Sequence, residues 1–116
     1  MTEYRGPDFS TRKKDVLVIN LGDDGELKLL PPTVEIHKGM VEVAKVVEQA
    51  TEGTLDYSDL DMGEYLRLVA AAMSHNTDMR RITPEHLEAI GFDLSDIGEF
   101  LGGYIFFVTR LVEGKN

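Results

Sequence analysis

The feature that most constrains this chain is the spacing of its apolar residues, which recur every three or four positions through three long stretches. Such a period places the apolar side chains on one face of an α-helix, and that face is buried against another element. The pattern predicts helices at 34–51, from 62 to about 75, and from 94 or 95 to 113. A fourth, short helix is predicted between Thr83, a helix cap followed by proline, and Gly91, a helix stop.

A β-hairpin is expected before the helices. Residues 16–19 form a β-branched run, 22–25 (Gly-Asp-Asp-Gly) are typical of a turn, and 26–30 alternate between polar and apolar. Leu27 and Leu29 are expected to face a core. The fold class is therefore mainly α (α+β), an N-terminal β-hairpin followed by three to four helices packed as a small bundle.

The 116 residues fit one domain. We expect residues 1–14 to be a disordered basic tail, residues 15–116 to be a single hairpin-plus-helical-bundle domain, and 52–61 to be an acidic loop. The tail carries four basic and two acidic residues, so the net charge of −9 divides into +2 for the tail and −11 for the rest. An acidic body repels phosphate backbones, so we expect no nucleic-acid partner.

The composition argues against several kinds of chemistry. The chain has no cysteine, which excludes disulfides, thiolate nucleophiles and zinc sites built on sulfur. The three histidines, His37, His75 and His86, lack the spacing that places two imidazoles on one helix face. The acid-rich stretch 56–64 has an acid, Asp61 or Glu64, at the sixth position where a calcium loop needs glycine. No nucleophile motif is present, so we expect no enzyme, metal or cofactor. With no signal peptide and no membrane-spanning run, we expect a cytoplasmic protein.

The segment before the last helix is similar to the attachment site of acyl carrier proteins, but its order is Asp93-Leu94-Ser95, with the serine displaced by one position. Ser95 is therefore interpreted as the cap of the last helix.

The last helix carries more apolar surface than one core face requires, because residues 104–108 are apolar on every side of the helix. Phe106 shares a second face with Gly98 and Gly102, and small residues beside an aromatic allow another helix to approach closely. Either a neighbouring helix of the same domain fills this face, or another protein or a second copy binds it. The candidate partner-binding residues are Gly98, Gly102, Gly103, Phe106, Phe107 and Arg110.

The layout resembles the tail assembly chaperones of long-tailed bacteriophages, chiefly over residues 64–104. Three segments carry the likeness: the second helix with Tyr-Leu-x-Leu-Val-Ala-Ala-Ala at 65–72, the helix start Ile-Thr-Pro-Glu-His-Leu at 82–87, and Phe-Asp-Leu-Ser-Asp-Ile at 92–97.

This resemblance implies a non-enzymatic protein that coats the tape measure protein while tail tube subunits assemble, in the cytoplasm of the host cell. The tape measure and tail tube proteins are then the expected partners. The alternatives are another phage structural component, such as a head–tail connector, or a small helical adaptor protein.

Overall fold

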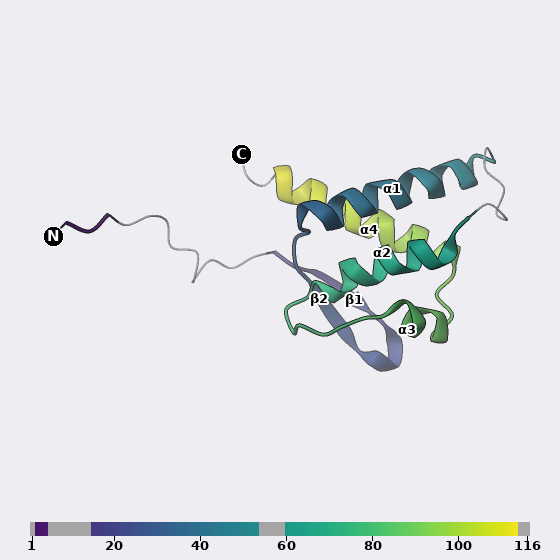
Figure 1. Cartoon of the computed structure of the whole chain (residues 1–116), viewed down its shortest axis with the longest axis horizontal. Coiled ribbons are helices and arrows are strands. Elements are labelled where there is room, and N and C mark those ends of the chain that lie inside the picture. Colours follow the sequence, from purple (N-terminus) through teal and green to yellow (C-terminus); the bar gives the residue numbers. More distant parts are fainter. Residues whose placement is uncertain (1, 5–14, 54–59, 114–116) are drawn as a thin grey trace.

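A computed structural model describes residues 2–4, 15–53 and 60–113. It confirms the predicted fold class, because a two-stranded antiparallel hairpin precedes four helices (Figure 1). The segment 5–14 of the predicted tail and residues 54–59 of the predicted acidic loop lie outside the described residues. The elements are β1 (Leu17–Asn20), the 3-10 turn η1 (Gly22–Asp24), β2 (Glu26–Leu29), α1 (Val34–Thr51), α2 (Met62–Ser74), α3 (Pro84–Ala89) and α4 (Leu94–Glu113).

The hairpin pairs β1 with β2 in a register that sets Leu17 opposite Leu29 and Ile19 opposite Leu27. Its turn closes through Gly25, whose φ of 82° suits glycine and whose carbonyl accepts a 2.9 Å hydrogen bond from the Leu21 amide. Leu27 and Leu29 are completely buried, as the alternation in the sequence predicts.

Three helices begin at side-chain caps, and the cap of α3 is the Thr83 that the sequence predicts. The Ile36 amide donates to Thr33 Oγ1 at 3.2 Å in α1, the Glu64 amide to Asp61 Oδ1 at 3.1 Å in α2, and the His86 amide to Thr83 Oγ1 at 3.1 Å in α3. Each bond pairs one of the first-turn amides that a helix leaves without an internal acceptor.

The start of α4 differs from the prediction. Asp93, and not Ser95, caps this helix, because the Asp96 amide donates to Asp93 Oδ1 at 3.0 Å and the Asp93 amide donates to Asp96 Oδ2 at 3.0 Å. This reciprocal pair satisfies two amides at once, whereas Ser95 is an exposed residue of the first turn.

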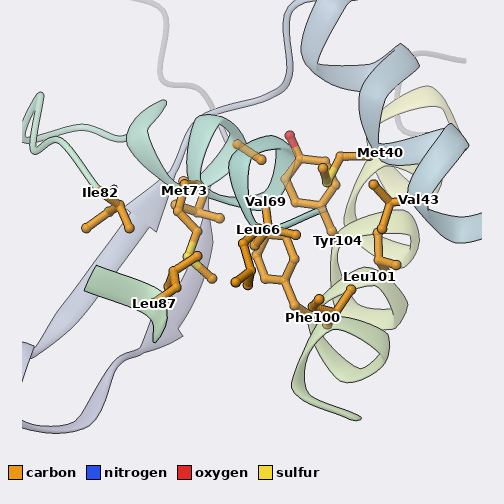
Figure 2. Close-up of a cluster of buried hydrophobic side chains, with 14 of the residues drawn as sticks. Met40, Val43, Leu66, Val69, Met73, Ile82, Leu87, Phe100, Leu101 and Tyr104 are labelled. Carbon is orange, nitrogen blue, oxygen red and sulfur yellow. The ribbon is translucent and has the colours of Figure 1, made fainter. Parts of the chain in front are cut away.

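The core lies where α1, α2 and α4 meet over one face of the hairpin, with α3 closing one end (Figure 1). Figure 2 shows side chains of all four helices meeting in one cluster around Leu66, Val69 and Phe100. Helices α1 and α2 approach closely at the buried Gly39, where an added Cβ would lie 3.0 Å from Leu68 Cδ2. Glycine at position 39 is unfavourable for the helix itself, but it allows α1 and α2 to pack closely.

The connection from α2 to α3 is organised by one buried polar side chain, Asn76, which is 4% exposed. Its Nδ2 donates to the carbonyls of Met73 and Arg80, both at 2.8 Å, and its Oδ1 accepts from the amides of Asp78 at 3.1 Å and Arg80 at 2.9 Å. Asn76 therefore fixes the turn that brings the chain from α2 back toward the hairpin.

Candidate functional site

Helix α4 presents two different sides. Its buried residues recur at helical spacing and point toward α1, α2 and the hairpin, and they are Ile97, Phe100, Leu101, Tyr104 and Phe107. The opposite side faces away from the core and contains exposed glycine, aromatic and charged residues. A helix with this division has one face for its own domain and one that is free for other contacts.

The six residues assigned from the sequence divide between these sides. Gly102 and Gly103 are exposed, with open space where a Cβ would stand, and Phe106 is 68% exposed. Arg110 is exposed beside Glu113, with Nη1 3.8 Å from Glu113 Oε2. These four residues lie together on the outer side of α4, and no described residue covers Phe106.

The other two residues lie elsewhere. Phe107 is only 9% exposed, because it follows Phe100 by two helical turns and so points into the core. Gly98 is partly buried and faces α1, where an added Cβ would lie 3.7 Å from Val47 Cγ1. Of the six residues predicted from the sequence, four therefore lie on the outer surface of α4: Gly102, Gly103, Phe106 and Arg110.

A groove of about 210 Å³ runs between α1 and α4. Met40, Ala44 and Val108 contribute apolar lining, and His37, Lys45 and Glu48 contribute polar groups. Val41 on α1 and Ile105 on α4 also line it and are 36% and 44% exposed. Apolar side chains that line a groove between two helices form the kind of surface that accepts the apolar face of a third helix.

Tyr104 belongs to both the core and the lining of this groove. Its ring lies 5.4 Å from that of Phe100 between centroids, and Figure 2 shows its hydroxyl directed away from Phe100 on the side of Met40. The hydroxyl is buried without a hydrogen-bond partner in the described part of the chain, and burial raises the pKa of Tyr104 to about 12.

Sequence reasoning missed the α1 half of this groove. The signal was present in Val41, an apolar residue that lies off the main apolar stripe of α1, lines the groove and is exposed in the structure. The helical spacing of the apolar residues in the last helix also predicts Ile105 on its broad apolar face, toward the core. The structure shows that it borders the groove.

Charged side chains also lie together where Asp24 of the hairpin turn meets His86 of α3. Asp24 Oδ2 lies 2.9 Å from His86 Nε2, and Asp24 Oδ1 lies 3.9 Å from Arg80 Nη2. These contacts connect the hairpin turn to α3 and to the connection before it. Among the described residues, no group of three His, Cys, Asp or Glu side chains is placed to hold a metal ion.

No described helix has the length and apolar character that crossing a membrane requires. Comparison with known proteins gives no match to a protein-family model, to a curated protein or to a solved structure.

Proposed function

We propose that this protein is a non-enzymatic assembly chaperone that binds an amphipathic helix of a partner protein in the groove between α1 and α4. The observation that carries the proposal is the groove itself, which is lined by apolar side chains and bordered by the half-exposed Ile105 and Val41. Phe106, on the neighbouring side of α4, extends the apolar surface. A partner helix with apolar residues at positions i, i+3, i+4 and i+7 suits such a groove.

The resemblance to phage tail assembly chaperones supplies the identity of the partner. In that role the protein binds the tape measure protein in the host cytoplasm and keeps this long, apolar helical chain dispersed until tail tube subunits enclose it. The net charge of −9 supports this role, because like-charged complexes repel one another and stay apart.

The test is co-expression with a tape measure protein encoded in the same gene cluster, followed by co-purification and light scattering. Several copies of this protein on one long chain would support the proposal. A stable closed ring of this protein alone, with no bound chain, would contradict it and favour a head–tail connector.

A matched pair of variants tests the groove. Ile105→Asp places a charge in the groove and is expected to abolish co-purification, whereas Ile90→Asp, at the end of α3 and outside the groove, is expected to leave it intact. The two isoleucines are 44% and 43% exposed, so the variants should remain equally folded by circular dichroism. Equal binding by both variants would refute the groove as the binding site.

A further inference from the structure

The two outer edges of the hairpin differ in their hydrogen bonding to the rest of the described chain. On the outer edge of β2, the Leu30 amide donates to the His75 carbonyl at 2.9 Å, and the Thr77 amide donates to the Lys28 carbonyl at 3.0 Å. Leu29 and Asn76 form a β-bridge between these two bonds. The connection that follows α2 therefore covers the outer edge of β2.

The outer edge of β1 is open among the described residues. Because Lys28 and Leu30 direct their bonding groups outward from β2, the alternation of an antiparallel ladder makes Leu27 and Leu29 the residues that bond to β1. Val18 and Asn20 on β1 then direct their amides and carbonyls away from β2. No described residue bonds to these four groups, and such an edge is a template for another strand.

A groove of about 370 Å³ lies along this same edge. All five residues from Leu17 to Leu21 line it, and consecutive residues of a strand point to opposite faces, so the groove follows the backbone edge of β1. Phe92 and Phe100 provide apolar lining, and Gly103 leaves open space on α4. A strand beside a helix, with an open edge and a groove between them, is a geometry that accepts an added peptide strand.

The charge of the groove indicates the chemistry of that peptide. The two charged residues that line it, Asp96 and Glu99 of α4, are both acidic, and the chain after residue 14 carries a net charge of −11. Lysine and arginine can lay their apolar stems along Phe92 and Phe100 while their charged ends reach toward the carboxylate of Glu99. A second copy of the acidic body would bring like charges together at this edge.

We propose that the open edge of β1 binds an extended, basic segment of a partner protein by adding it as a third strand, with alternate side chains in the groove along α4. This site is separate from the groove between α1 and α4.

The test uses fluorescent synthetic peptides of alternating valine and lysine, with alternating valine and glutamate peptides of the same length as the comparison. Binding to the full chain is measured by fluorescence anisotropy. Val18→Pro removes an outward amide without removing a bond of the β1–β2 ladder, and proline is tolerated at strand edges. Val18→Thr keeps that amide and the β-branched shape, so it is the matched control.

The valine–lysine peptide is expected to bind at least about tenfold more tightly than the valine–glutamate peptide. Val18→Pro is expected to weaken its binding by about tenfold or more, Val18→Thr by less than about twofold, and Glu99→Lys to weaken it as well. Ile105→Asp is expected to leave this binding unchanged, so failure of this site and failure of the proposed function are distinguishable. Equal binding by Val18→Pro and wild type, with the ladder intact by amide exchange, would overturn the proposal.

Amide exchange of the free protein provides an independent measurement. The Val18 and Asn20 amides are expected to exchange rapidly without peptide and to be protected when the valine–lysine peptide is bound. Protection in the free protein would overturn the proposal, because a second copy or residues 1–14 would then already cover the edge. Light scattering would distinguish these two occupants.

Discussion

Replacing Gly102 and Gly103 of α4 by alanine is expected to stabilise the protein. Both glycines lie inside the helix, and an added Cβ would meet no atom within 4 Å at either position. Alanine in a helix interior is favoured over glycine by about 1 kcal/mol, because glycine loses more backbone freedom on folding. Neighbouring helix residues do not face each other, so the double variant should gain roughly 1 to 2 kcal/mol.

The gain is measurable by urea unfolding followed by circular dichroism and by thermal melting. For a domain near 100 residues, 1 kcal/mol corresponds to a shift of about 4 °C in Tm, so the double variant should melt roughly 4 to 8 °C higher. Melts at low and high protein concentration separate the stability of the monomer from any effect of self-association.

Gly91→Ala is a control that is expected to have the opposite effect on the free energy of unfolding. Space for a Cβ is equally open there, but the residue has a φ of +79° at the end of α3. The Gly91 amide donates to the Glu88 carbonyl, and the Phe92 amide donates to the Leu87 carbonyl, both at 3.0 Å. This is the bonding pattern of a helix that ends at a residue in the left-handed conformation. Gly91→Ala should therefore destabilise the protein by about 1 kcal/mol.

A double variant at Gly102 and Gly103 that is no more stable than wild type would refute the reasoning. It would mean that the two Cβ positions are already occupied in solution, and that this side of α4 is covered.

Three further variants test other features. Asn76→Ala should cost roughly 2 to 4 kcal/mol of unfolding free energy in urea, because it removes four hydrogen bonds from a turn centred on a buried side chain; a cost below about 1 kcal/mol would contradict this role. Tyr104→Phe should be neutral or stabilising by up to about 1 kcal/mol, since the lost hydroxyl has no partner among the described residues. Burial raises the pKa of Tyr104 from 10.0 to about 12, so the unfolded chain loses this proton at a lower pH than the folded protein does. The free energy of unfolding of the wild type should therefore fall as the pH rises from 10 toward 12, and urea titrations should show a smaller fall for Tyr104→Phe. An equal fall in both proteins would refute this. Phe106→Asp should change stability by less than about 0.5 kcal/mol, because the ring is 68% exposed; unfolding of this variant would show that Phe106 is a core residue.

The elements could be predicted from the sequence wherever their signals are local. Thr33, Asp61 and Thr83 each act within one helical turn, so their capping roles follow from nearby residues alone. The cap of α4 was harder because Asp93 and Ser95 are both good capping residues, and only the reciprocal bond with Asp96 decides between them.

The candidate site could be predicted only in part. Periodicity showed that α4 has surplus apolar surface, but residues 104–108 are apolar on every side and leave open which of Phe106 and Phe107 points inward. The packing of α4 against its neighbours decides this, and it buries Phe107. The groove with α1 could not be predicted, because it depends on how two helices separated along the sequence lie against each other.

The position of Tyr104 and Phe107 on α4, which follows the hairpin, α1 and α2 in the chain, affects how the core forms during synthesis. The hairpin and α1 leave the ribosome before α4, whose side chains complete their core. Until then, the buried leucines of β2 and the inner face of α1 lack these partners and are available for incorrect contacts. Folding of this core is therefore completed only after α4 has emerged, and nascent chains that stop before α4 should depend on cellular chaperones to remain soluble.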